Sequence, residues 1–248
     1  MLEIKELSKS FGGLAAVSHV NISVDEGQIV SLIGPNGAGK TTLFAMVAGF
    51  LKPDAGTVTF EDQDITGFKP HRICDRGIVR TFQVTQPFAT LNTLQNIMVG
   101  AYHCTANRHE AEERARAVAD RVGMSALLDQ AAEGLTVAGR KRLELARTLA
   151  TEPKLLLLDE VMAGLNPTEI DEIVGVIKGI RDSGVTIFLI EHVMKAVMNL
   201  SDHAYVLNDG VLIAEGTPTE IAANPNVIEA YLGHGAAERM SVEGTPDA

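Results

Sequence analysis

The sequence is poor in the residues that cross-link small proteins and bind zinc. Its 248 residues include no tryptophan and only two cysteines, Cys74 and Cys104. The two cysteines form no Cys-x-x-Cys motif, and no cluster of histidines and cysteines accompanies them. These absences exclude a disulfide framework and a structural zinc site, and they are typical of a chain from a reducing cytosol.

Long hydrophobic segments are missing as well. The apolar runs at residues 155–158 and 185–190 are far shorter than the roughly 20 residues that span a bilayer. The first residues, Met1-Leu2-Glu3-Ile4-Lys5, have no features of a signal peptide. We therefore expect a soluble chain, so that any role at a membrane must come through a partner.

A surplus of positive charge is also absent, because the formal net charge is −11. This balance disfavours a general nucleic-acid surface, and we expect no nucleic-acid partner. The sequence has no internal repeat, low-complexity segment or Ser/Gly linker. A chain of this length buries about 70–75% of its unfolded surface, so we expect a substantial core.

What the chain does contain is a glycine-rich motif near the N-terminus. Residues 34–42 match the pattern G-x-x-x-x-G-K-[ST] without a mismatch. The motif follows an apolar run at residues 28–33, which is typical of a buried strand. It precedes residues 42–49, whose apolar side chains recur at helical spacing and end at a glycine. The order of strand, loop and helix is that of a phosphate-binding loop (P-loop).

The residue types in this motif suit a nucleotide. Glycines allow unusual backbone angles, so the loop can press its N–H groups against phosphate oxygens. Lys40 adds a positive charge for the β- and γ-phosphates, and the Thr41 hydroxyl is placed to bind Mg²⁺. The predicted nucleotide-binding residues are Gly34, Pro35, Asn36, Gly37, Ala38, Gly39, Lys40, Thr41 and Thr42.

Two acidic residues, Asp159 and Glu160, follow a run of four leucines. Ligands of parallel α/β sheets gather where strands end, so these acids are the expected complement of the P-loop. Asp159 is predicted to hold Mg²⁺ through water, and Glu160 to act as the base for the attacking water. The alternative is a pair of surface acids that merely ends a strand.

The remaining patterns predict an α/β fold with a P-loop NTPase core. This core consists of a mostly parallel sheet and an N-terminal antiparallel β subdomain, and the chain also contains a helical insert. We predict one domain over residues 1–235, with its core at residues 1–87 and 151–235, the insert at 88–150 and a flexible tail at 236–248. Within the insert and after it, helices are predicted at residues 108–122, 140–150, 167–184, 218–223 and 225–232. Residues 133–139 are predicted as a loop and residues 78–83 as a strand.

In this order of motifs the chain resembles the nucleotide-binding subunits of ABC transporters over about residues 2–233. Phe11 occupies the place of the adenine-stacking aromatic residue, and Val17 follows in the same nucleotide-binding segment. Gln83 corresponds to the Q-loop, and residues 135–139 to the signature loop. Residues 163–166 correspond to the D-loop, and His192 corresponds to the switch histidine. Without the resemblance, Phe11, Gln83 and His192 would be explained as a core aromatic, an edge polar residue and a core histidine.

The resemblance implies an ATPase that works as a dimer with ATP and Mg²⁺. Lys40, Gln83, Glu160 and His192 would form the catalytic set, and Thr41, Gln83 and Asp159 would bind Mg²⁺. Each ATP would lie between one P-loop and the signature loop of the other subunit. The signature residues that would contact the nucleotide are Thr136, Val137, Ala138 and Gly139.

The signature loop departs from the family pattern L-S-G-G-Q. Thr136 can replace the serine hydroxyl, but Val137 and Ala138 stand at glycine positions and cannot adopt glycine-only backbone angles. Asn166 replaces the D-loop aspartate, and Val161 replaces the proline that follows the catalytic glutamate. These departures leave open whether this half-site is as effective as the usual one.

Within the family, the chain most resembles the larger ATPase subunit of branched-chain amino-acid importers. The implied partners are a second ATPase subunit, identical or different, two transmembrane permeases and, indirectly, a periplasmic or extracellular binding protein. The chain would lie on the cytoplasmic face of the inner membrane and dock near residues 83–94, with Pro87 and Phe88 in contact. The segments that carry this closer resemblance are residues 11–17, 80–83, 163–167, 190–194 and 224–233.

Three alternatives stay open at this point. A related exporter ATPase has similar motifs, and an ATPase subunit does not touch its cargo, so the transported solute is not encoded here. A soluble ABC ATPase that acts on DNA or ribosomes is disfavoured by the single cassette, acidic balance and short insert. A small-molecule kinase would share the P-loop but would leave Thr136 and His192 without a role.

Overall fold

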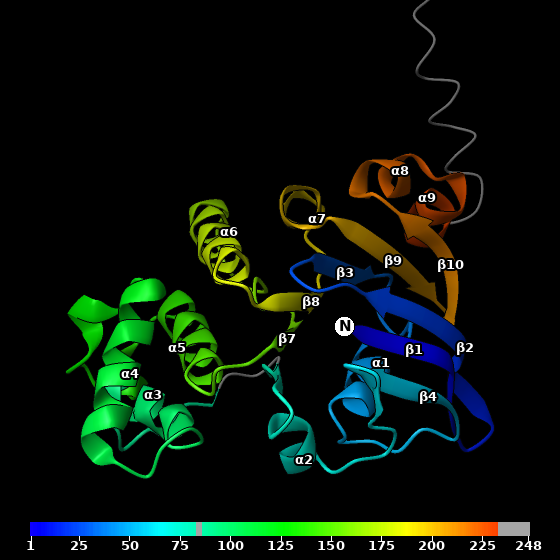
Figure 1. Cartoon of the computed structure of the whole chain (residues 1–248). Helices are drawn as coiled ribbons and strands as arrows, with labels where there is room; N and C mark the ends of the chain where they lie inside the picture. The colour runs from blue at the N-terminus through cyan, green and yellow to red at the C-terminus, as the bar shows by residue number, and fades with distance from the viewer. Residues whose placement is uncertain (83–85, 233–248) are drawn as a thin grey trace, which may run out of the picture.

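The computed structural model describes residues 1–82 and 86–232, and it contains two sheets (Figure 1). The smaller sheet is antiparallel, with its strands in the order β2-β1-β4-β5. Its long hairpin turns at Gly12 and Gly13, which both have positive φ. The strands are β1 (Leu2–Phe11), β2 (Leu14–Val24), β4 (Ala55–Phe60) and β5 (Gln63–Asp64). This sheet is the antiparallel part that the sequence predicts.

The larger sheet has the order β10-β9-β3-β8-β7-β6. Its strands from β9 to β6 are parallel, and β10 is antiparallel to β9. Every residue of β3, β7 and β8 is buried, which explains their continuous apolar sequences. The strands are β3 (Ile29–Ile33), β6 (Ile78–Arg80), β7 (Leu155–Asp159), β8 (Thr186–Ile190), β9 (His203–Asn208) and β10 (Val211–Gly216).

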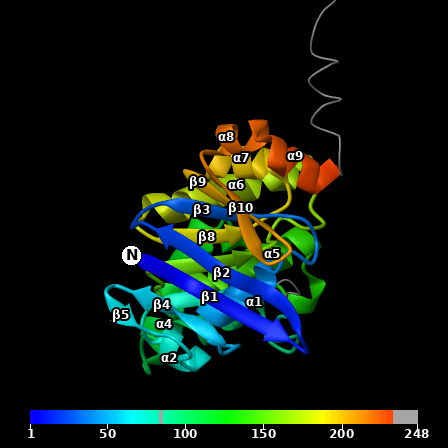
Figure 2. The same cartoon turned by 90° about the vertical axis from the view of Figure 1, so that its right-hand side faces the viewer.

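Helix α1 (Lys40–Val47) joins the two sheets through one hydrophobic cluster. Its Phe44 ring lies 4.9 Å from the ring of Phe188 in β8, and the same cluster contains Leu2 and Phe60 of the smaller sheet. Figure 2 views the molecule from the side of β1 and β2, which lie in front of the larger sheet. The P-loop, which precedes α1, is therefore held by both sheets.

The segment from residue 93 to residue 149 is helical and lies to one side of the sheets (Figure 1). In α4 the buried face consists of alanines and a valine, while its glutamates and arginines lie on the outer side. The helices are α3 (Thr93–Ala101), α4 (Arg108–Arg121) and α5 (Val137–Leu149), with 3₁₀ turns at Ser125–Leu127 and Ala132–Gly134. The domain boundaries at residues 87/88 and 150/151 stay predictions.

Helix α6 (Pro167–Asp182) begins as the sequence predicts. The Asn166 side chain accepts from the backbone N–H of Glu169, the Glu169 carboxylate accepts from that of Asn166, and Pro167 occupies the first turn. Ile173, Ile177 and Ile180 face the core. The C-terminal helices α8 (Pro218–Ala223) and α9 (Pro225–Leu232) also follow the predicted ranges.

Some local predictions are wrong. Residues 133–139 are not a loop, because a 3₁₀ turn ends at Gly134 and α5 begins at Val137, three residues earlier than predicted. The predicted strand at residues 78–83 ends at Arg80. Helices α2 (Pro70–Cys74) and α7 (Met194–Leu200) have no predicted counterpart. The predicted tail at residues 236–248 lies outside the described residues.

Within residues 1–82 and 86–232, no helix combines the length and apolar character that a bilayer crossing requires.

Candidate nucleotide-binding site

The P-loop has a backbone that needs glycine. Gly34 and Gly39 have φ values of 147° and 103°, which side chains rarely allow. A Cβ atom at Gly34 would lie 2.0 Å from the carbonyl oxygen of Leu207, and one at Gly39 would lie 2.2 Å from that of Ala16. Positive φ and close backbone packing therefore both exclude larger residues at these two positions.

A cavity of about 650 Å³ opens over the P-loop. Four further segments of the chain reach it, contributing Ala16, Glu160, His192 and Tyr231. Helix α1 begins at the same place. The N–H groups of its first turn and the positive end of its dipole favour an anion here. The lining residues are Ala16, Gly34, Pro35, Asn36, Gly37, Ala38, Gly39, Lys40, Thr41, Thr42, Glu160, His192 and Tyr231.

Lys40 is held close to the loop. Its side-chain Nζ donates to the carbonyl oxygens of Gly34 and Pro35 at 2.7 and 2.9 Å, and the residue is only 6% exposed. Burial lowers the pKa of Lys40, whereas the nearby charges of Glu160 and Asp159 act in the opposite direction. The ammonium group is thus placed inside the loop that would surround a phosphate.

Asp159 ends β7 in a buried position. Its Oδ2 accepts from Nη2 of Arg80 at 2.5 Å, and its backbone N–H donates to the Thr81 hydroxyl at 3.0 Å. Its Oδ1 is buried and has no hydrogen-bond partner among the described residues. Thr41 and Asp159 line one further cavity of about 430 Å³. The Thr41 hydroxyl and a carboxylate oxygen of Asp159 are suitable ligands for Mg²⁺. This ion needs only one or two protein ligands where phosphates and water supply the remaining ones.

Glu160 and His192 come together because β7 and β8 are parallel neighbours. Asp159 lies opposite Ile190 in this pairing, so the residues that follow both strands emerge at the same edge. Glu160 has a φ of 49°, and its N–H donates to the carbonyl of Ile190 at 3.0 Å. Lys141 of α5 donates to the carbonyl oxygen of Glu160 at 3.3 Å. The predicted base and the predicted switch histidine therefore share one cavity with Lys40.

The sequence analysis gave no role to Tyr231, which lines the cavity, or to Glu191, which directly precedes the lining residue His192. Glu191 is fully buried, its Oε1 accepts from the N–H of Met162 at 3.0 Å, and burial raises its pKa to about 7. Tyr231 of α9 reaches the cavity beside the backbone of Gly34. Both residues lie in segments that carry the closer family resemblance, 190–194 and 224–233, but no motif assigns either of them a role.

Other predicted residues do not line the P-loop cavity. Phe11 is 50% exposed at the tip of the β1–β2 hairpin, and Val17 is buried in the core, so the cavity takes only Ala16 from that segment. Residues 136–139 lie elsewhere, at the start of α5. Thr136 caps this helix by accepting from the N–H of Gly139 at 3.1 Å. Gln83 lies outside the described residues.

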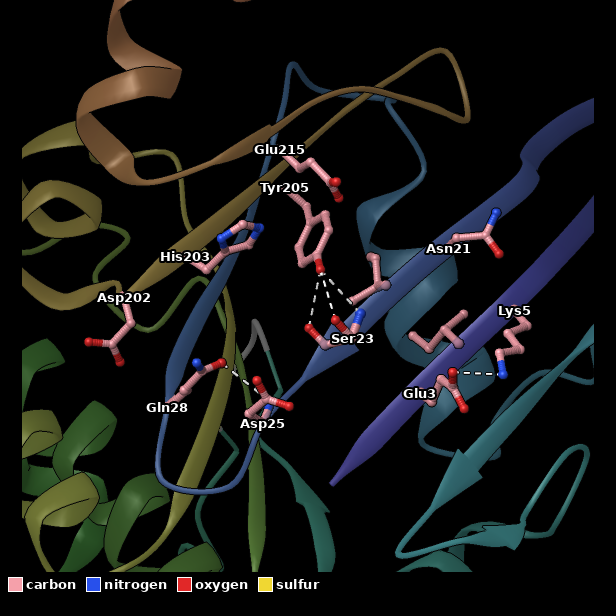
Figure 3. A pocket seen from close by; sticks show the side chains of 12 residues that line it. Glu3, Lys5, Asn21, Ser23, Asp25, Gln28, Asp202, His203, Tyr205 and Glu215 are labelled. Atoms are coloured by element: carbon pink, nitrogen blue, oxygen red, sulfur yellow. Dashed lines mark hydrogen bonds and ion pairs between the residues drawn. The ribbon is translucent and has the colours of Figure 1, made fainter.

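A polar cavity of about 520 Å³ lies between the two sheets (Figure 3). The Tyr205 hydroxyl contacts both the side chain and the backbone of Ser23, and Lys5 pairs with Glu3. Asp202 accepts from the N–H of Ile29 at 2.8 Å. Of these contacts, the one between Tyr205 and Ser23 links β9 of the larger sheet to β2 of the smaller sheet. None of the described residues that line the cavity is a predicted site residue.

Comparisons with known proteins agree with this geometry. A family model described as ABC transporter matches residues 17–163, and one described as branched-chain amino acid ATP-binding cassette transporter matches residues 211–237. The "High-affinity branched-chain amino acid transport ATP-binding protein BraF" of Pseudomonas aeruginosa is 41% identical, over 94% of this chain and 98% of its own. The corresponding LivG protein of Salmonella typhimurium is 42% identical with the same coverage.

Solved structures support the same assignment. A nucleotide-free ATP-binding cassette from an ABC transporter superposes with a TM-score of 0.86 at 33% identity, over 94% of this chain and 99% of that chain. A cassette in its ADP conformation has the same TM-score at 34% identity, with the same coverage of both chains. The predicted P-loop fold is therefore confirmed. The ATP-binding subunits of ABC transporters are ATPases. The prediction that this chain is an ATPase is therefore confirmed as well. By family model, sequence identity and fold, the chain belongs to the ABC transporter family.

Proposed function

We propose that this chain is the ATP-hydrolysing subunit of an importer for branched-chain amino acids or related small polar solutes. It would act at the cytoplasmic face of the inner membrane. The observation that carries the catalytic part is the single cavity shared by the P-loop, Lys40, Glu160 and His192. The names of the 41–42% identical relatives and the C-terminal family match support this cargo class over an exporter or a soluble ATPase.

The chain's own groups divide the work of hydrolysis. The N–H groups of the P-loop and Lys40 bind the phosphates, while Glu160 accepts a proton from the attacking water. His192 would hold that water and the γ-phosphate in line, and Gln83 would assist. Thr41 and Asp159 would hold Mg²⁺, which neutralises the charge that builds on the phosphate oxygens.

A second ATPase subunit, identical or different, would complete each site. Residues 136–139 do not line this chain's own P-loop cavity, and Val137 is exposed at the N-terminus of α5. This surface is free to meet a phosphate bound to another subunit, where the helix N-terminus favours the negative charge. ATP bound between two subunits would hold them together until hydrolysis releases them.

Two permease subunits would dock beside the helical segment, with a binding protein acting through them. Phe82 and Phe88 are exposed there, and Arg147 of α5 lies over the Phe88 ring. Exposed aromatic side chains flanked by an arginine are typical of the central contacts of protein interfaces. Cysteines placed at Phe88 or Ala89 are expected to cross-link to a cytoplasmic loop of a permease in the active complex.

Substitution of two site residues separates binding from hydrolysis. Lys40→Ala is expected to remove most ATP binding, measured by equilibrium titration. Glu160→Gln should keep ATP affinity and slow phosphate release by about 10²–10⁴-fold, because the base is lost. Lys52→Ala, at an exposed lysine, is the control and should change neither quantity. Near-normal affinity in Lys40→Ala or near-normal turnover in Glu160→Gln would contradict the assignment.

Uptake by cells tests the cargo. Deletion of the gene should abolish high-affinity uptake of radiolabelled leucine, and the wild-type chain should restore it. Glu160→Gln should not restore uptake although the protein is made. Unchanged leucine uptake after deletion would exclude this cargo while leaving the ATPase proposal intact.

A further inference from the structure

The carboxylate proposed to bind Mg²⁺ already has a positive partner. Nη2 of Arg80 lies 2.5 Å from Oδ2 of Asp159, and the two side chains are only 8% and 2% exposed. The guanidinium also lies 6.0 Å from the ring centre of Phe44 and 5.9 Å from that of Phe82. These contacts hold the charge of Arg80 in place. The other carboxylate oxygen of Asp159, Oδ1, is buried and has no hydrogen-bond partner among the described residues.

Such a pair acts against a second cation. A guanidinium does not lose its proton at physiological pH, so Arg80 carries a permanent charge. Repulsion between charges is strong where water is excluded, and Mg²⁺ at Asp159 would meet this repulsion. Removal of Arg80 would take away the positive charge in direct contact with the buried carboxylate, although Lys40 stays nearby. The carboxylate would then attract a cation more strongly.

The same short segment reaches the helical part of the chain. Thr81 accepts from the backbone N–H of Asp159 at 3.0 Å, and the N–H of Phe82 donates to Oε1 of Glu144 at 2.5 Å. Glu144 belongs to α5, the helix that begins at the signature residues. Arg80 therefore lies in a segment bonded on one side to the strand of Asp159 and on the other side to α5.

We propose that Arg80 is a built-in counter-ion of Asp159 that competes with Mg²⁺, so that the site takes up the metal only together with nucleotide phosphates. This inference rests on the proposed role of Asp159 as a Mg²⁺ ligand. The negative charge of the phosphates attracts Mg²⁺ and so offsets the repulsion between Mg²⁺ and Arg80. Arg80 acts through Asp159 and is a positioning residue.

Titration of the metal ion tests this role without turnover. Mn²⁺ serves as a spectroscopic probe for Mg²⁺, and electron paramagnetic resonance measures its binding to the full chain with and without ADP. Arg80→Met should tighten Mn²⁺ binding in the presence of ADP by about tenfold or more and allow binding without nucleotide. Arg80→Lys, which keeps the charge, should stay near wild type. Arg72→Met, at an exposed arginine that lies over Phe68, is the control.

The outcomes separate this inference from the proposed function. Unchanged or weaker Mn²⁺ binding in Arg80→Met would overturn the competition. If Arg80→Met does not fold, Arg80→Gln removes the charge while keeping a donor toward Asp159 and gives the same test. Asp159→Asn should abolish the nucleotide-dependent Mn²⁺ signal. If it does not, the proposed metal ligand itself is wrong, whereas loss in Asp159→Asn with no change in Arg80→Met rejects only the role of Arg80.

Discussion

The buried carboxylate of Glu191 connects the turn after Glu160 to the residues that follow β8. Its carboxylate accepts from the backbone of Met162, two residues after the proposed base, and it directly precedes His192. Burial away from water raises its pKa from an ordinary 4.5 to about 7. The group therefore holds the turn after Glu160 against the end of β8, and it keeps a proton where most glutamates have lost theirs.

This raised pKa predicts a pH dependence of stability. Between pH 4.5 and about 7 the folded chain keeps the proton on Glu191 while the unfolded chain loses it. The Glu191 contribution to the free energy of unfolding is thus fully present below about pH 4.5, falls as pH rises through about 7, and is then lost. Glu191→Gln should remove about 3 kcal/mol of this decline, measured by urea unfolding at about pH 5 and about pH 8.

The exposed residue Glu26 provides the control for this measurement. Glu26→Gln should leave the pH dependence as in wild type. A Glu191→Gln protein with the wild-type decline would show that Glu191 is ionised in the folded chain throughout this range.

The glycines of the P-loop differ in how strongly their surroundings exclude a side chain. Gly34 combines positive φ with a close carbonyl contact, whereas Gly37 has a φ of 84° and open space around a Cβ. Gly37→Ala should cost only about 1–2 kcal/mol of backbone strain and keep ATP affinity within a fewfold. Gly34→Ala must move the loop away from β9 and should weaken ATP binding more than tenfold. Thermal unfolding and nucleotide titration of both variants measure the difference, and equal affinities would contradict the role of the close contact.

Thr136 is the N-cap of α5, and this local role must be separated from the proposed contact with another subunit. Thr136→Ala should lower stability by about 1 kcal/mol, because the N–H of Gly139 loses its acceptor. A hydrogen bond to a phosphate oxygen would add about 1.5–3 kcal/mol in the closed dimer only, so turnover in the assembled complex should also fall. ATP affinity of the single chain should not change.

Thr136→Ser is the matched control because it keeps the hydroxyl group. It should behave as wild type in thermal unfolding, ATP titration and turnover. Normal turnover in Thr136→Ala, together with a lowered melting temperature, would limit Thr136 to capping the helix. Hydrolysis would then depend on the site that the signature loop of the other ATPase subunit completes.

At the scale of the whole molecule, the proposed dimer should depend on ATP. Glu160→Gln should form a dimer when ATP is added and stay monomeric without it, measured by sedimentation velocity. Val137→Glu in the same protein puts a negative charge at the exposed start of α5, where it would repel the phosphate of the other subunit. This second substitution should abolish the dimer while ATP still binds.

Association that needs a different ATPase subunit would identify the pair as a heterodimer. A dimer that persists in Val137→Glu would contradict the proposed interface.

The sequence alone determined the features that depend on neighbours along the chain. The P-loop from Gly34 to Thr42, the capped start of α6 at Asn166 and the acids after β7 are each readable because a few consecutive residues set the local geometry. The family resemblance indicated that Glu160, His192 and the P-loop belong to one site. The structure places them around one cavity, and their roles stay predictions. Helix α5 begins three residues before its predicted start, because a threonine cap such as Thr136 is a weak local signal.

Only the tertiary structure decided which distant residues meet. Arg80 pairs with Asp159 because β6 lies beside β7, and Glu191 reaches Met162 because β7 lies beside β8. These partners are far apart in sequence, and strand order is set by burial of whole sheets rather than by any short pattern. For the same reason only the fold shows that Glu191 is buried, which raises its pKa, and that Arg80 lies against Asp159.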